Sequence, residues 1–252
     1  MNENYKNLVQ DLVDDLKAVF THAGLGGEAG EYKLLTQSFL YKFLNDKFLY
    51  EAKAVDTKNI YEELVKMSPD DYRWLLEDIG TATAQLKPEQ FIETLHRKQN
   101  EDNFYEIFEA TLNQIAIDNN DIFSVHTDGD TAIRLFDERL ITDNISDSSK
   151  RNQVARAIIN LLARIKFDET IFSQGFDFFS TLFEYMIKDY NKDGGGKYAE
   201  YYTPHSVAKI IADILVGNDQ PSNVRIYDPS AGSGTLLMNL ASRIGVDKTT
   251  VY

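Results

Sequence analysis

Apolar residues recur at helical spacing along most of the first 170 residues of the chain. Two early examples are a series through Leu8, Leu12 and Leu16 and a wide apolar face within residues 35–48. The same spacing predicts further helices at about residues 69–79, 88–98, 102–118, 148–165 and 176–190. The aromatic side chains, Trp74 among them, keep this period, so we expect them in the core rather than on a binding surface. The pattern predicts a mostly helical first part.

One helix start can be located to the residue. Ser68 is a favourable N-cap, Pro69 suits the first helical position, and Asp70 and Asp71 place negative charge at the positive end of the helix dipole. We therefore expect a helix to begin at Pro69.

The pattern changes in the last quarter of the chain. Val224–Tyr227 is a short apolar run, broken only by Arg225, that predicts a buried strand. Asp228 and Pro229 end the run, and Ala231–Gly234 is a turn of small residues that leads into an apolar helical pattern. A strand, a glycine turn and a helix in this order are how open α/β sheets build ligand sites at the carboxyl ends of their strands.

The positions of the glycines exclude two common phosphate sites. A dinucleotide fingerprint needs a third glycine where Leu237 stands. A phosphate loop fails because Tyr198 follows Gly196-Lys197 and Asn191 occupies the required upstream glycine position. A different ligand is therefore expected at this turn.

The remaining pattern, strand-Asp-Pro-small-small-Gly-Ser-Gly, resembles the S-adenosylmethionine site of DNA methyltransferases. It is preceded, about twenty residues upstream, by the sequence EYYTPH. Together the two motifs resemble the modification subunit of type I restriction–modification systems, an N6-adenine DNA methyltransferase family. The resemblance implies cofactor-binding roles for Glu200, Tyr201, Tyr202, Thr203, Pro204, His205, Asp228, Pro229, Gly232, Ser233 and Gly234.

The resemblance also implies an architecture and an activity. We expect a helical N-terminal domain over residues 1–169 and the opening, truncated portion of an α/β Rossmann-like methyltransferase domain over residues 170–252. Thr203 is expected as an N-cap with Pro204 at the first helical position. The implied reaction is methyl transfer from S-adenosylmethionine to adenine N6 in DNA. The implied partners are DNA, a specificity subunit, a restriction subunit and a second modification subunit.

The family's Asn-Pro-Pro-aromatic loop, which holds the target adenine, is absent from the sequence. The chain has five prolines and no two of them are adjacent. We therefore expect no catalytic residue within the chain and no activity from it alone. A second strand is expected to begin at Val251, so the chain reads as an N-terminal piece of a longer subunit.

Composition and charge narrow the class of protein. Hydrophobic content is 43%, there is no cysteine, and no apolar run reaches the length of a membrane span, so we expect a cytoplasmic protein. The net charge of −14 lies entirely in the first 189 residues, because residues 190–252 carry six basic and six acidic side chains. Such a surface repels DNA and suits solvent or a basic partner. No two of the four histidines are four residues apart, so no metal site is expected.

Two other functions remain open. The chain could be a helical interaction module that docks specificity or nuclease subunits without binding cofactor. It could also belong to a methyltransferase that acts on RNA or protein, because the cofactor turn is common to those enzymes.

Overall fold

A computed structural model describes residues 3–26, 29–81, 83–123, 134–172, 203–231, 234–245 and 248–251. The chain divides into a larger unit, Gln10–Phe172, and a smaller unit in which Ser173–Tyr252 is grouped with Met1–Val9. The expectation of a mostly helical first part is confirmed. The predicted helix at residues 176–190 lies outside the described residues.

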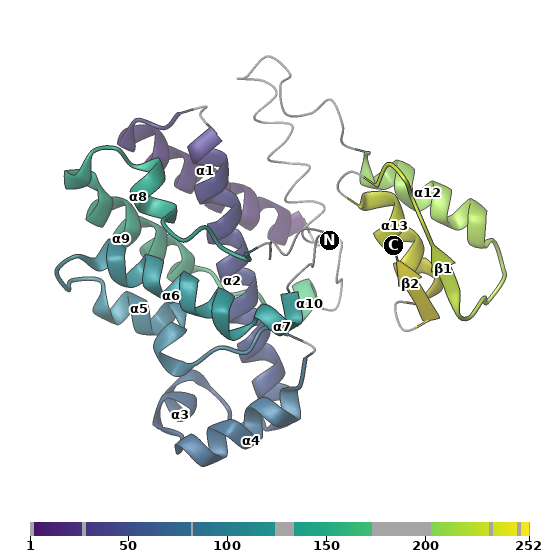
Figure 1. Cartoon of the computed structure of the whole chain (residues 1–252), viewed down its shortest axis with the longest axis horizontal. Helices are drawn as coiled ribbons and strands as arrows, with labels where there is room; N and C mark the ends of the chain where they lie inside the picture. The colour runs from purple at the N-terminus through teal and green to yellow at the C-terminus, as the bar shows by residue number, and fades with distance from the viewer. Residues whose placement is uncertain are drawn as a thin grey trace. The chain divides into compact units, whose positions relative to one another are not determined.

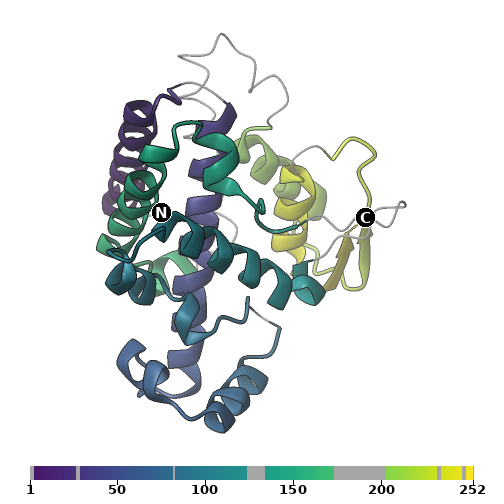
Figure 2. The same cartoon turned by 60° about the vertical axis from the view of Figure 1, so that its left-hand side comes forward.

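The larger unit is built of helices, shown in Figures 1 and 2. They are α1 (Glu3–Ala23, which begins within the smaller unit's segment), α2 (Ala29–Val55), α3 (Tyr61–Lys66), α4 (Pro69–Ile79), η1 (Pro88–Gln90), α5 (Ile92–Lys98), α6 (Phe104–Asp118), α7 (Asn120–Phe123), α8 (Leu140–Asn144), α9 (Ser148–Arg164) and α10 (Glu169–Phe172). Helix α2 is the longest and packs against α4, α8 and α9.

Helix α2 carries the core because apolar side chains cover several of its faces. Leu35, Phe39 and Phe48 are fully buried, as the helical period predicts. A buried ion pair lies among them, with the Lys42 Nζ atom 2.8 Å from the Asp46 Oδ2 atom. Burying two charges is tolerated here because they neutralise each other and because the Asp46 Oδ1 atom also accepts from the Asn45 side-chain amide at 2.8 Å.

Helix α4 begins as predicted. Pro69 is its first residue, and the Ser68 Oγ atom accepts a hydrogen bond from the Asp71 backbone N–H at 3.2 Å. The expectation that Trp74 is a core residue is wrong, because its side chain is 61% exposed. Tyr72, Leu75 and Ile79 form the buried side of α4, and Trp74 lies between these positions on the helix, facing away from them.

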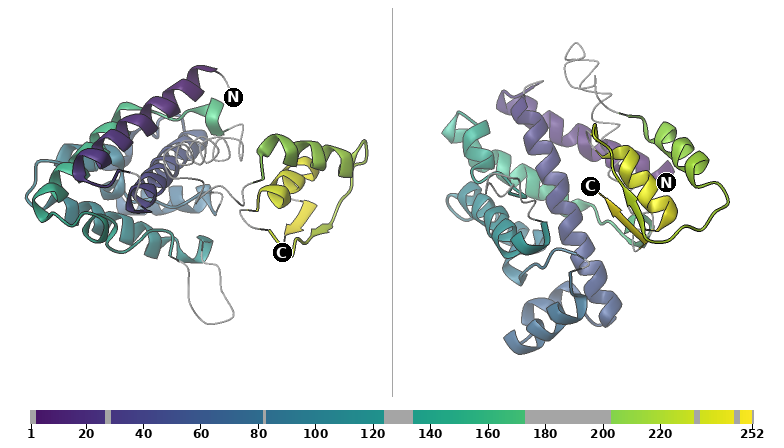
Figure 3. Two further views of the ribbon diagram at one scale, coloured as in Figure 1. Left: turned by 90° about the horizontal axis from the view of Figure 1, so that it is seen from above. Right: turned by 45° about the vertical axis from the view of Figure 1, so that its right-hand side comes forward.

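The smaller unit contains α12 (His205–Val216), β1 (Val224–Ile226), α13 (Thr235–Ile244) and β2 (Thr249–Val251). The two strands are parallel, with Val224 opposite Thr249 and Ile226 opposite Val251. Helix α13 is the crossover between them, and α12 packs beside α13, as both panels of Figure 3 show.

Two details of these strands differ from the predictions. Tyr227 lies outside β1 and is 73% exposed, because the strand ends one residue earlier than the apolar run does. The second strand begins at Thr249 rather than Val251. Both threonines of β2 are β-branched, which suits a strand although they are not apolar.

None of the described helices is both long enough and apolar enough to cross a membrane.

Candidate functional site

The turn between β1 and α13 starts with a local hydrogen bond of Asp228. Its Oδ1 atom accepts from the Ser230 backbone N–H at 2.8 Å, which is an Asx turn. This bond uses one carboxylate oxygen and turns the chain sharply at the carboxyl end of the strand. Asp228 is half-buried, whereas Pro229 and Ser230 are exposed. Asp228 therefore shapes the turn and still presents carboxylate to its surroundings.

Gly234 closes the turn and serves as the N-cap of α13. Its φ of 72° and ψ of 9° place it in the left-handed region, which glycine adopts without steric cost. The Gly234 N–H donates to the Ala231 carbonyl at 2.8 Å. A Cβ atom at this position would meet only the Met238 side chain at 3.9 Å, so backbone conformation rather than space demands the glycine. No side chain among the described residues caps α13 at this end.

Apolar packing holds the turn against the strand. Ile226 of β1 is buried with Leu237 and Ala241 of α13, and Val224 and Leu240 pack around them. The apolar helical pattern predicted from the sequence therefore faces β1. This packing fixes where the first turn of α13 lies relative to the end of the strand.

The expected start of α12 is wrong by one residue. Pro204, not Thr203, is the N-cap, and the helix begins at His205. The Pro204 carbonyl accepts from the backbone N–H groups of Val207 at 3.0 Å and Ala208 at 3.1 Å. Because proline lacks an N–H group and fixes φ, it fits the position just before the helix as well as the first helical position.

His205 links the start of α12 to the helix that follows the glycine turn. Its Nδ1 atom lies 3.1 Å from the Nδ2 atom of Asn239 on α13. The Asn239 Nδ2 atom also donates to the Thr235 carbonyl at 2.8 Å, and Asn239 is buried. At the far end of α13, the Arg243 Nε atom lies 2.8 Å from the Asp213 Oδ1 atom. The first turn of α12 is thus held beside the first turns of α13.

Asn239 contacts a candidate site residue and was not predicted from the sequence. The available signal was a polar residue inside an apolar helical run, four positions after Thr235. Such a residue is buried only when its hydrogen bonds are satisfied.

The structure describes about half of the residues predicted to bind cofactor. It places Thr203, Pro204 and His205 at the start of α12, and Asp228, Pro229 and Gly234 around the turn. Glu200, Tyr201, Tyr202, Gly232 and Ser233 lie outside the described residues. Within the described ranges, no group of three or more acidic or histidine side chains is placed to hold a metal ion.

Comparison with known proteins identifies the relatives of this chain. Residues 174–251, which include both motifs, match the family model described as N-6 DNA Methylase. This chain is similar to N-6 DNA methylases and to type I modification subunits. The resemblance inferred from the two motifs is therefore confirmed.

Two type I methyltransferase subunits are among the matches. The type I restriction enzyme MpnII methylase subunit of Mycoplasma pneumoniae is 23% identical over 222 residues, which are 84% of this chain and 40% of that protein. The crystal structure of a type I restriction–modification methyltransferase subunit from Streptococcus thermophilus has the same fold, with a TM-score of 0.64 at 21% identity. The match covers 97% of this chain and 52% of the Streptococcus thermophilus chain. The chain thus spans about half the length of these relatives or less.

Proposed function

We propose that this chain is part of an S-adenosylmethionine-dependent adenine-N6 DNA methyltransferase subunit of a type I restriction–modification system. In this proposal the turn after β1 and the start of α12 form one wall of the cofactor site. The observation that carries it is Gly234 in the left-handed region between a parallel strand and the helix that follows it. The match of residues 174–251 to N-6 DNA methylases supports the same assignment.

The strands support a Rossmann-like continuation of the sheet. Parallel strands normally occur in larger sheets that are covered on both faces, and a two-stranded sheet is marginal by itself. Helix α12 buries Ala208, Ala212 and Val216 but has a second, exposed apolar face. This exposed face consists of Val207, Ile210, Ile211, Ile214 and Leu215. A helix that is apolar on both sides is typical of a protein interior, so we propose that further parts of the methyltransferase domain cover α12.

The residues around the turn suit the polar groups of the proposed cofactor. The Asp228 carboxylate can accept hydrogen bonds from an ammonium or hydroxyl group. The first turn of α13 has backbone N–H groups without partners inside the helix, which suit a carboxylate. S-adenosylmethionine supplies an electrophilic methyl group on a sulfonium. The role proposed for Asp228, Gly234 and the start of α12 is to bind and orient that molecule.

This chain does not supply the groups that would hold the adenine amino group during methyl transfer. When bound, S-adenosylmethionine would supply the methyl group to the adenine amino nitrogen, which would lose a proton in return. Holding that amino group requires polar acceptors and an aromatic face for a flipped base. No Pro-Pro-aromatic sequence is present to provide them. We therefore propose that the chain alone does not methylate DNA.

The proposed partners follow from the family. They are a specificity subunit, a restriction subunit, a second modification subunit and DNA. The negative charge of the first 189 residues opposes phosphate contact, so we propose that DNA is bound mainly by other parts of the complex.

The experiment is calorimetric titration of S-adenosylmethionine into the complete protein that contains this sequence. Asp228→Ala is compared with Asp219→Ala, which removes an exposed carboxylate from the same unit. The proposal expects wild-type binding, weaker binding by Asp228→Ala and no change in Asp219→Ala. Transfer of labelled methyl groups is then measured with DNA, RNA and protein as separate acceptors.

Two results would overturn the proposal. A complete, folded protein that binds no S-adenosylmethionine would favour the helical interaction module. Cofactor binding followed by transfer to RNA or protein but not DNA would favour the other class of methyltransferase.

A further inference from the structure

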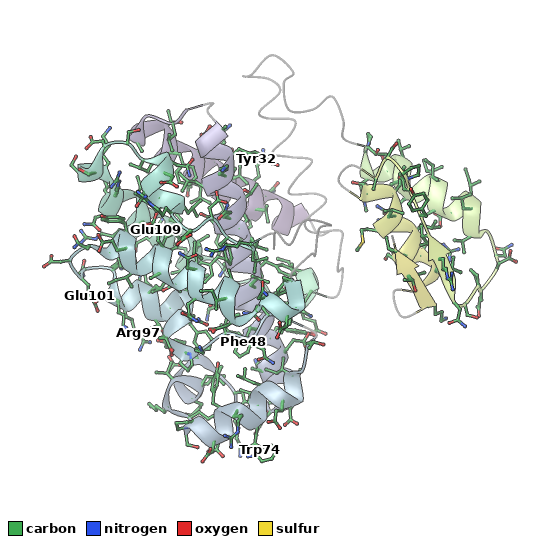
Figure 4. The ribbon with its side chains drawn as sticks, in the orientation of Figure 1. Tyr32, Phe48, Trp74, Arg97, Glu101 and Glu109 are labelled. Carbon is green, nitrogen blue, oxygen red and sulfur yellow. The ribbon has the colours of Figure 1, made fainter. Side chains whose placement is uncertain are left out.

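The outer face of α4 presents the only tryptophan of the chain to solvent. The Trp74 side chain is 61% exposed, and Figure 4 shows it on the outer side of α4, away from the other helices. Tryptophan is the residue most enriched among side chains that dominate binding energy at protein interfaces. Its exposure makes the outer face of α4 a candidate binding surface.

Helix α4 holds Trp74 on a fixed base. On the inner side, the Tyr72 hydroxyl donates to the Leu86 carbonyl at 2.5 Å. At the C-terminal end, the Gln85 Nε2 atom lies 3.3 Å from the Leu76 carbonyl oxygen and 3.4 Å from that of Gly80. A short helix fixed on its inner side and at its end loses little freedom on binding, and this favours affinity.

Carboxylates surround Trp74 on the helix surface. Asp70 and Asp71 lie four and three positions before it, and Glu77 and Asp78 lie three and four positions after it. Residues at these spacings are neighbours on a helix, and all four acidic side chains are exposed. Arg73 pairs with Asp70 at 3.0 Å, so the face retains a net negative charge.

The helix dipole favours only two of these four acidic residues. Asp70 and Asp71 lie in the first turn, where negative charge is favourable. Glu77 and Asp78 lie in the last turn, where the helix dipole disfavours negative charge, and that turn contains no basic residue. Neither carboxylate forms an ion pair with any residue in the part of the chain that the structure describes. Helix stability therefore does not explain the acidic residues that follow Trp74.

We propose that this outer face of α4, defined by Trp74 with Asp70, Asp71, Glu77 and Asp78, binds an arginine- or lysine-bearing segment of a partner protein. A cationic side chain stacks on the indole ring and is attracted to the flanking carboxylates. DNA does not fit this face, because its phosphates would meet the carboxylates. The inference does not depend on methyl transfer.

The test measures binding of a fluorescein-labelled peptide of alternating arginine and alanine, with a glutamine–alanine peptide as the neutral probe. Binding is followed by fluorescence anisotropy at low and near-physiological salt. Two variants probe the surface: Trp74→Ala, and Glu77→Gln combined with Asp78→Asn. Matched controls are Ile117→Ala, which is also 61% exposed, and Glu101→Gln combined with Asp102→Asn, an exposed adjacent pair in the loop before α6. The unfolding midpoint of each variant confirms that it is folded.

The proposal expects the arginine peptide to bind wild type and the neutral peptide not to bind. Trp74→Ala should weaken binding at least about tenfold. Neutralising Glu77 and Asp78 should weaken it several-fold and reduce its salt dependence, while both controls bind as wild type does. Three results would overturn the proposal: no binding of the arginine peptide, Trp74→Ala binding within about twofold of wild type, or an equal loss in the Glu101 and Asp102 variant.

Discussion

The His205 Nδ1 atom and the Asn239 Nδ2 atom lie 3.1 Å apart, although the two residues are 34 positions apart in the sequence. The Asn239 amide nitrogen has two hydrogens, and the second is donated to the Thr235 carbonyl. The other hydrogen points to the His205 Nδ1 atom, which can accept it. This relationship links the start of α12 to the helix that follows the glycine turn.

The first prediction concerns this link. Asn239→Ala should destabilise the smaller unit by about 1–3 kcal/mol, because it removes the hydrogen bonds that the buried Asn239 amide makes to His205 and to the Thr235 carbonyl. Hydrogen exchange of the backbone amides in α12 and α13 should become faster. Asn218→Ala, an exposed residue just after α12, is the control and should leave the exchange unchanged. Equal exchange in both variants would show that the contact does not hold the helices together.

The second prediction concerns Gly234. With φ at 72°, Gly234→Val should cost at least about 1–2 kcal/mol, because a β-branched side chain is strained in the left-handed region. Gly234→Asn should retain most of the stability, since asparagine tolerates this conformation. In the complete protein, the valine variant should also lose S-adenosylmethionine affinity by calorimetry. If valine and asparagine behave alike, backbone conformation is not the reason for glycine at this position.

The third prediction concerns the buried pair in α2. Lys42→Met should lower the free energy of unfolding by about 3–5 kcal/mol, because Asp46 would remain buried without its cation. The same substitution at Arg134, which forms an exposed pair with Glu138 at 3.0 Å, should cost no more than about 1 kcal/mol. Urea unfolding followed by Trp74 fluorescence measures both. If the two variants lost similar amounts of unfolding free energy, burial of the Lys42–Asp46 pair would not make it more costly to break than the exposed pair.

The Asp46 carboxylate makes the Lys42–Asp46 ion pair difficult to replace with apolar residues. The Asp46 Oδ2 atom also accepts from the Phe167 backbone N–H at 2.7 Å. A double variant, Lys42→Met with Asp46→Leu, removes the unpaired charge but also removes the hydrogen bond from the Phe167 N–H to Asp46. We expect it to be more stable than Lys42→Met and less stable than wild type.

The fourth prediction concerns pH. Burial by itself would raise the pKa of Asp118, but hydrogen bonds from Lys87, Gln114 and Gln90 outweigh this effect and hold the pKa below its ordinary value. A carboxyl whose pKa is lowered by folding stabilises the protein above its unfolded pKa of about 3.9, and that stability is lost as the pH falls through the lowered value.

Asp118→Asn should therefore be less stable than wild type at pH about 6, and the difference should shrink as the pH falls below about 4. Thermal unfolding across this range measures the effect, with Asp121→Asn as an exposed control. A difference between Asp118→Asn and wild type that stays constant down to pH about 2 would contradict the prediction.

Local features of the fold were predictable from the sequence because they depend on near neighbours in the chain. The apolar period of α2 places Leu35, Phe39 and Phe48 on buried faces in any packing that uses the helix. Ser68 caps α4 through an N–H group three residues away. The order of strand, Asp228, glycine turn and helix likewise depends on short-range backbone preferences.

Tertiary structure alone decided which residues meet across long separations and which remain uncovered. The contact between His205 and Asn239 and the bond from the Phe167 N–H group to Asp46 join segments that are 34 and 121 residues apart. The helical period of aromatic residues did not predict that Trp74 lies outside, because Tyr72, Leu75 and Ile79 already fill the buried side of α4. Periodicity shows which residues share a face of a helix, but only packing determines which face meets another helix.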